Sequence, residues 1–291
     1  MTINIKERRL LKRRLELLYR TFDLKFLSPD PLEFVHKFKS AGEREVVGII
    51  ASSLAYGRVA QILASIERVM ELMDHDPLSF ILSFEPKRDM KIFRNFKHRF
   101  NDGKDLACLI YFARQMIDAD GSIGAFFLKG YSKEDETIKE ALENFTERAL
   151  ALDGAFIYKR KKLPKEAGVR YFFPSPAKLS ACKRLNLYLR WMVRRGDSLD
   201  FGLWRSIDPA KLIIPLDTHI ARISANIGLT ARKTADWRMA EEITSALREL
   251  DPKDPVKYDF SLARLGILEK CPKRKERAKC EACLIREICV L

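Results

Sequence analysis

The sequence predicts an all-α protein, and three observations carry this prediction. Apolar residues recur at helical spacing along most of the chain, which gives each expected helix one apolar face. No run alternates apolar and polar residues for long enough to indicate a sheet. Asp-Gly pairs interrupt the helical stretches, because glycine adopts turn conformations that other residues resist; the pairs lie at 102–103, 120–121 and 153–154.

The same spacing places the individual helices. The basic stretch 5–18 is expected to form an amphipathic helix, since Ile5, Leu11, Leu15 and Leu18 recur at helical spacing. It lacks the apolar core and cleavage site of a secretion signal. A pair of helices is expected at 43–56 and 59–73, separated by Tyr56-Gly57-Arg58. Further helices are expected at 104–118, 135–152, 177–195, 218–227, 236–250 and 255–268.

Composition and charge narrow the classes of partner. With 47% hydrophobic and 32% charged residues, the chain of 291 residues falls among soluble globular proteins. No stretch approaches the ~20 apolar residues that a membrane helix requires, so we expect no membrane partner. The 54 Lys and Arg residues outnumber the 40 Asp and Glu residues, for a net charge of +14. This excess favours a polyanionic partner, nucleic acid first, although solubility alone explains such a charge equally well.

A basic loop is expected at 158–175. Its cations could follow phosphates while Phe172 and Phe173 contact bases, but a solvated run of charge is the commoner explanation. The cations of this loop are Lys159, Arg160, Lys161, Lys162, Lys165 and Arg170.

The C-terminal tail contains four of the six cysteines, in the pattern Cys271-x8-Cys280-x2-Cys283-x5-Cys289. Thiolates this close repel one another, so the tail is expected to hold either Zn or an iron–sulfur cluster, in a reducing cytoplasm. Spacing alone does not separate the two, because a Cys-x2-Cys pair serves both. The remaining cysteines, Cys108 and Cys182, are expected to be small core residues.

Asp217-Thr218-His219 opens the helix expected at 218–227. Asp217 is placed as an N-cap, and this is a common structural use of aspartate. Because Cys271 follows Asp217 by 54 positions, the segment and the tail together resemble the endonuclease III-like helix-hairpin-helix DNA glycosylase superfamily. The segments 54–58 and 181–186 fit the same resemblance. They would form an uncharacterised branch with a divergent hairpin, because the usual hairpin glycines are missing before Lys183.

The resemblance implies roles for particular residues. The four tail cysteines would hold a [4Fe-4S] cluster, with Zn as the alternative. Asp217 would stabilise positive charge on the sugar, Lys183 would attack it as an amine, with Lys178 as the fallback, and Thr218 and His219 would support them. Tyr56 or Arg58 would fill the gap that a flipped base leaves, although an aromatic residue that closes the turn is equally plausible for Tyr56. The cations between the first two cysteines would bind DNA phosphates: Lys273, Arg274, Lys275, Arg277 and Lys279.

The implied architecture has two helical domains with a DNA-binding cleft between them. One would be a helical barrel over 41–204, and the other would join 1–40 to 205–291. The expected function is a DNA repair glycosylase, with or without AP lyase activity. It would act as a cytoplasmic, nucleoid-associated monomer on double-stranded DNA with a damaged base or an abasic site. The alternatives are a non-catalytic nucleic-acid-binding iron–sulfur or zinc protein on the same scaffold, and a zinc module for protein contacts.

Overall fold

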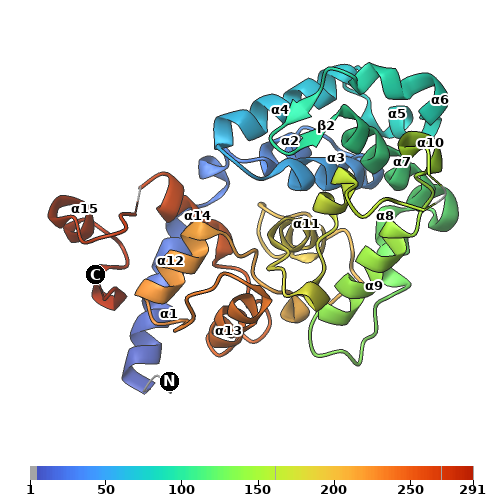
Figure 1. The fold of residues 1–291 in the computed structure, drawn as a ribbon. Helices are drawn as coiled ribbons and strands as arrows, with labels where there is room; N and C mark the ends of the chain where they lie inside the picture. Colours follow the sequence, from blue (N-terminus) through green and yellow to red (C-terminus); the bar gives the residue numbers. More distant parts are fainter. Residues whose placement is uncertain (1–4, 161, 270, 291) are drawn as a thin grey trace. The chain divides into compact units, whose positions relative to one another are not determined.

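The chain is predominantly helical, which confirms the all-α class (Figure 1). The structure, a computed structural model, describes residues 5–160, 162–269 and 271–290, so Lys161 of the expected basic loop lies outside the described residues. In the described part of the chain, the strands are β1 (Lys97–His98) and β2 (Asn101–Asp102), which form a short antiparallel hairpin. No helix among these residues is long and apolar enough to cross a membrane.

The chain divides into two compact units. Unit 1 comprises Met1–Leu27, Leu179–Gly202 and Ile207–Leu291, and unit 2 comprises Ser28–Lys178 and Leu203–Ser206. Residues 179–202, expected in the 41–204 domain, therefore group with the two chain ends. The expected DNA-binding cleft stays a prediction.

Unit 2 contains two of the helix boundaries that aspartate and glycine set. Asp102 caps the long helix α7, where its side chain accepts hydrogen bonds from the backbone N–H groups of Lys104 and Asp105. Gly121 ends α7 in the left-handed conformation, with φ of 84°. The helices of unit 2 are α2 (Leu32–His36), α3 (Ala41–Leu54), α4 (Val59–Leu72), α5 (Pro77–Ser83), α6 (Pro86–Asp89), α7 (Gly103–Asp120), α8 (Ile123–Leu128), α9 (Lys139–Leu150) and α10 (Ala155–Tyr158), with 3-10 turns η2 (Met90–Phe93), η3 (Gly168–Phe172) and η4 (Pro176–Lys178).

Unit 1 joins both ends of the chain. Helix α14 packs against both α1 and α12, and α1 also contacts the C-terminal turn η6. The helices of unit 1 are α1 (Ile5–Thr21), α11 (Lys183–Val193), α12 (Thr218–Asn226), α13 (Trp237–Arg248), α14 (Asp259–Ile267) and α15 (Arg277–Glu281), with 3-10 turns η1 (Leu24–Phe26), η5 (Pro209–Lys211) and η6 (Arg286–Ile288).

Buried ion pairs explain why α11 belongs with the chain ends. Arg190 pairs with Asp259 of α14 and lies 3.3 Å from Asp200. Arg194 lies 2.8 Å from Asp254 and 3.0 Å from Asp200. Removing one member of such a buried pair costs roughly 3–5 kcal/mol, because its partner is left charged and unpaired. The arginines therefore hold α11 and the residues after it in unit 1.

Candidate functional site

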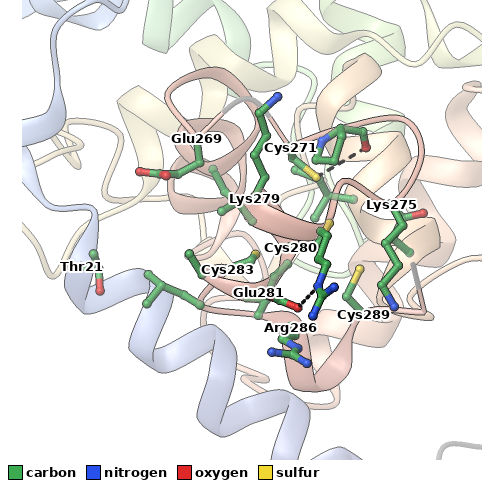
Figure 2. A pocket seen from close by; sticks show the side chains of 18 of the residues that line it. Thr21, Glu269, Cys271, Lys275, Lys279, Cys280, Glu281, Cys283, Arg286 and Cys289 are labelled. Carbon is green, nitrogen blue, oxygen red and sulfur yellow. Dashed lines mark hydrogen bonds and ion pairs between the residues drawn. The ribbon is translucent and has the colours of Figure 1, made fainter.

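All four tail cysteines border one cavity of about 900 Å³ in unit 1 (Figure 2). Cys280 lies in α15, Cys283 follows α15, Cys289 follows η6, and Cys271 follows α14. Other residues of the tail, among them Lys275, Arg277 and Lys279, form part of the wall. The remainder includes Thr21 at the end of α1, Ile223 and Asn226 of α12 and Leu265 of α14. Cysteines up to 18 positions apart in sequence thus face the same space.

The tail is attached to the helices around it. Arg222 of α12 donates a hydrogen bond of 2.8 Å to the carbonyl oxygen of Cys271. Near the end of the tail, the N–H of Val290 donates to the carbonyl of Asn226, at 2.9 Å, and Glu287 pairs with Arg14 of α1. These contacts join the cysteine loop to both α1 and α12.

Two thiols of the cavity, those of Cys271 and Cys283, are poorly placed to ionise alone. Burial raises the pKa of Cys271, and Arg222 works against that shift, while Cys289 and Cys280 add to it. Burial also raises the pKa of Cys283, and the other three cysteines of the tail add to the shift. The charges of neighbouring tail cysteines therefore help to raise the pKa of Cys271 and of Cys283. A bound cation would remove this penalty, because a coordinating thiol is deprotonated.

Four thiols can hold either a zinc ion or a [4Fe-4S] cluster. A zinc ion takes four ligands at about 2.3 Å from sulfur, so the sulfurs must converge on one point. Within the described residues, no group of three or more His, Cys, Asp or Glu side chains is placed to hold a metal ion in this way. A [4Fe-4S] cluster is larger than one ion and takes one thiolate at each iron. The four-thiol donor set suits either occupant.

The five cations expected to bind phosphates are all exposed, and Lys275, Arg277 and Lys279 also line the cavity. Arg277 pairs with Glu281, at 3.0 Å, and Lys279 pairs with Glu276, at 2.6 Å. The other three make no ion pair with any residue that the structure describes; they are Lys273, Arg274 and Lys275. Their charge is available to a polyanion.

Asp217 is the N-cap of α12, as its position in the sequence predicts. Its Oδ1 accepts hydrogen bonds from the N–H groups of His219 and Ile220, at 2.8 and 2.9 Å. Its Oδ2 makes no hydrogen bond with the described residues. Burial raises the pKa of Asp259 to about 6 against the opposing effect of Arg190, and the charge of Asp217 adds to the increase. Asp217 therefore lies close to the buried ion pairs of α11.

The Asp-Thr-His segment is also connected to the cysteine cavity. The Nδ1 of His219 lies 3.3 Å from Nη2 of Arg222, the same nitrogen that bonds to the carbonyl of Cys271. His219 also packs closely on α14, where a Cβ at Gly266 would lie 2.7 Å from the Cβ of His219. Only glycine allows α12 and α14 to approach so closely at this position.

Lys183 and Lys178 lie in different units. Lys183 is the half-buried first residue of α11 in unit 1, and Lys178 is exposed in unit 2. Lys183 shares a helix face with Arg190, because seven residues make about two helical turns. Cys182, just before Lys183, is buried in the left-handed conformation, and its thiol donates to the carbonyl of Ser180. Cys108 is also buried, so both cysteines are core residues.

Tyr56 closes the turn between α3 and α4. Its hydroxyl lies 2.6 Å from Oδ1 of Asn101 and 2.9 Å from the carbonyl oxygen of His98, so it is bonded to the β1–β2 hairpin. These contacts favour the structural alternative for Tyr56 over insertion into DNA. Arg58 remains exposed as the N-cap of α4.

The side chains of the expected basic loop are less exposed to solvent than its composition indicates. Phe172 and Phe173 are buried, so they do not face a partner. Arg170 donates hydrogen bonds to the carbonyls of Pro164 and Leu163 within the loop, at 2.7 and 2.9 Å. The expectation that these aromatic residues contact bases is therefore not met.

A surface that the sequence analysis missed lies at the β1–β2 hairpin. Phe100 at its tip is 70% exposed, and exposed cations precede it at Lys91, Arg94, Lys97 and Arg99. The signal was present in the sequence, because 90–101 interleaves phenylalanine with these cations and contains no acidic residue.

Comparison with known proteins gives one match. The family model described as "Protein of unknown function (DUF2400)" matches residues 30–268. No curated protein and no solved structure matches the chain. The match covers Tyr56, Arg58, Lys183 and Asp217 but ends before Cys271, so the cysteine tail lies outside it.

This match corrects the resemblance to the endonuclease III-like superfamily. The matching model is that of a different family, and no model of that superfamily matches. Similar motif spacing misled the sequence analysis, because an aspartate N-cap and a Cys-x2-Cys pair both arise in unrelated folds. Any role for the candidate residues must therefore rest on their own chemistry. The chain belongs to the family of proteins of unknown function designated DUF2400.

Proposed function

We propose that this protein binds nucleic acid and holds a [4Fe-4S] cluster with Cys271, Cys280, Cys283 and Cys289. The observation that carries the proposal is that all four cysteines of the tail border one cavity. The donor set is all sulfur, which suits iron–sulfur clusters and structural zinc alike. The cavity, of about 900 Å³, has room for the larger of the two, the cluster.

The cluster would be structural in this proposal. When bound, it would supply positive charge that keeps the four thiolates ionised. It would also tie the tail to the end of α14. Arg222 would support the site from α12 through its bond to the carbonyl of Cys271. The loop between the first two cysteines would then be held in a fixed shape, with its cations exposed to solvent.

The charge of that loop supports a polyanionic partner. Lys273, Arg274 and Lys275 are exposed and make no ion pair with described residues, so no internal partner neutralises them. Phosphates would do so and would release counterions from the nucleic acid. Ordinary solubility needs no such concentration of unpaired cations beside a metal site.

A pair of matched variants tests the cluster. Cys283→Ser removes a cavity thiol, whereas Cys108→Ala removes a core thiol outside the cavity. Each protein is purified without oxygen and examined by visible absorption. We expect the charge-transfer absorption of an iron–sulfur cluster in the wild type and in Cys108→Ala, and its loss in Cys283→Ser. A colourless wild-type protein that contains zinc would contradict the cluster and favour the zinc alternative.

A second candidate function is the cleavage of an N-glycosidic bond, as the sequence analysis expected. The observation that favours it is the free Oδ2 of half-buried Asp217, in the same unit as Lys183. As the departing base takes the bonding electron pair, this carboxylate would stabilise the positive charge on the sugar. Water or the neutral amine of Lys183 would then bond to the sugar carbon and release a proton.

Base release and borohydride trapping test this second function. Duplexes with an oxidised purine or an abasic site are incubated with wild type, Asp217→Asn, Lys183→Ala and Lys178→Ala. Base release that is lost in Asp217→Asn, with a covalent adduct lost in Lys183→Ala alone, would support both assignments. Full turnover by Asp217→Asn would exclude the aspartate. The absence of release and adduct in the wild type would leave the binding function.

A further inference from the structure

We infer that the β1–β2 hairpin of unit 2 is a second nucleic-acid-binding surface, which stacks an unpaired base on Phe100 and holds the neighbouring phosphates with the cations of residues 91–99. This surface is separate from the tail, so it does not depend on the cluster. The partner is a single-stranded nucleic acid, or a strand with unpaired bases.

The aromatic part of the surface is a cluster of three rings. The ring of Phe100 is parallel to that of Tyr56, at an interplanar angle of 6° and a centroid separation of 6.4 Å. The ring of Tyr171 packs edge-on against both, with centroids at 5.0 Å from Tyr56 and 5.8 Å from Phe100. Phe100 is 70% exposed and Tyr171 is 41% exposed, so two large apolar rings face solvent side by side.

Hydrogen bonds beneath the rings hold them in place. Besides the two bonds of the Tyr56 hydroxyl, Nε2 of His98 lies 3.0 Å from the carbonyl oxygen of Tyr56. Asn101 donates to the carbonyl of Gly168, at 2.8 Å, and so connects the hairpin to η3, which contains Tyr171. Exposed rings on a fixed support lose little conformational entropy when they bind a partner. The exposure of Phe100 is thus a built feature and not a frayed loop end.

The tip of the hairpin adds a cation next to the ring. Arg99 has φ of 52°, and its guanidinium lies 5.2 Å from the centroid of Phe100. Its side chain passes over Gly57, where a Cβ would lie 2.8 Å from Cδ of Arg99. Gly57 therefore leaves the space that Arg99 occupies.

A hollow of about 380 Å³ lies in the same unit and is lined by Arg68, Lys91 and Arg94, with Asn95 and Phe96. Arg68 is paired with Glu71, but Lys91, Arg94, Lys97 and Arg99 make no ion pair with described residues. Phe100 follows Arg94 by six positions, which limits the distance between their Cα atoms to about 22 Å. One short strand could therefore reach both the hollow and the ring.

The combination of exposed aromatic rings and neighbouring cations favours a nucleic acid with unpaired bases over other partners. Every base has a face that can stack on an aromatic ring, but in a duplex both faces are covered by neighbouring base pairs. An apolar protein partner would not need a row of unpaired cations beside the rings, and an acidic peptide would offer no ring faces to Phe100. Cations that follow the backbone beside aromatic rings that take the bases are typical of single-strand binding.

Fluorescence anisotropy with a labelled oligothymidine of about 12 nucleotides tests the inference on the full-length protein. Phe100→Ala and Tyr171→Ala are each expected to weaken binding about 5- to 150-fold, the range that loss of one base–aromatic stack produces. Phe100→Trp should bind at least as well as wild type, whereas Phe100→Leu, which keeps an apolar side chain, should bind as weakly as Phe100→Ala. Equal binding by Phe100→Leu and wild type would contradict stacking.

Two controls separate this surface from the tail and from charge alone. On an oligonucleotide whose bases are replaced by abasic sites, wild type and Phe100→Ala should bind alike, since no base remains to stack. In the background of the tail variant Lys273/Arg274/Lys275→Ala, the further substitution Phe100→Ala should weaken binding to oligothymidine by the same factor as it does in the wild type. If Phe100→Ala and Tyr171→Ala both bind oligothymidine like wild type, the inference is wrong even where the tail binds duplex DNA. If Phe100→Ala no longer weakens binding to oligothymidine once the tail cations are removed, the hairpin is not an independent surface.

Discussion

The tail variant Lys273/Arg274/Lys275→Ala should change the salt dependence of duplex DNA binding by a defined amount. For duplex DNA, each phosphate neutralised by a cation contributes about 0.9 to the slope of log K against log salt concentration. The three substituted cations make no ion pair with described residues, so each is free to neutralise a phosphate. The variant should therefore reduce the magnitude of the slope by as much as about 2.7.

The structure also supplies the matched comparison for this measurement. Arg277→Ala and Lys279→Ala remove cations that are already paired with Glu281 and Glu276, so each should change the slope by less than one unpaired cation does. A third variant, Lys233/Arg238/Lys253→Ala, removes the same charge from exposed positions of unit 1 that lie outside the tail.

Binding is measured by anisotropy over a series of salt concentrations, and thermal unfolding checks that each variant is folded. If the tail variant keeps the wild-type slope, the tail does not contact phosphates. If the Lys233/Arg238/Lys253 control lowers the slope equally, net charge and not the tail accounts for binding.

Three further predictions concern the framework around the sites. Arg194→Met should destabilise the protein by roughly 3–5 kcal/mol, because loss of this arginine, whose side chain is 3% exposed, leaves Asp254 without its partner and Asp200 with Arg190 alone. Urea unfolding measures this, and a loss below about 1 kcal/mol would mean that the pairs do not hold α11. Asp217→Ala should lower the free energy of unfolding by roughly 0.5–2 kcal/mol, and Asp217→Asn should lower it much less, since asparagine also caps a helix. Equal losses of stability for the two variants in thermal unfolding would argue against the cap. Burial raises the pKa of Glu45 above its ordinary value, so its contribution to stability is fully present at low pH and is lost as pH rises through its folded pKa. Glu45→Gln should therefore flatten the fall of unfolding free energy as pH rises above the ordinary glutamate pKa, and an unchanged profile would place the titration elsewhere.

Local signals in the sequence predicted much of the helical framework. The helix expected at 59–73 is found at Val59–Leu72, and the one expected at 236–250 is found at Trp237–Arg248. Asp217 caps its helix as expected, because the cap depends only on the residues that follow it. The ordered pattern of the cysteines likewise pointed to one shared site, and all four border one cavity.

Features that depend on long-range partners were not predictable in this way. The place of α11 follows from the pairing of Arg190 with Asp259, 69 residues later in the chain, which periodicity does not report. The β1–β2 hairpin escaped notice because its strands have two residues each, too few for an alternating pattern. The burial of Phe172 and Phe173 in a basic segment could not be seen from composition, because their packing partners come from other elements, as Phe112 does for Phe173.

The central claim is that the tail holds a [4Fe-4S] cluster, and the most direct measurement is the content of iron, acid-labile sulfide and zinc per chain in wild-type protein purified without oxygen. The account predicts about four irons and about four sulfides per chain, with little zinc. One zinc per chain without iron or sulfide would contradict it and would assign the cysteines to a single metal ion.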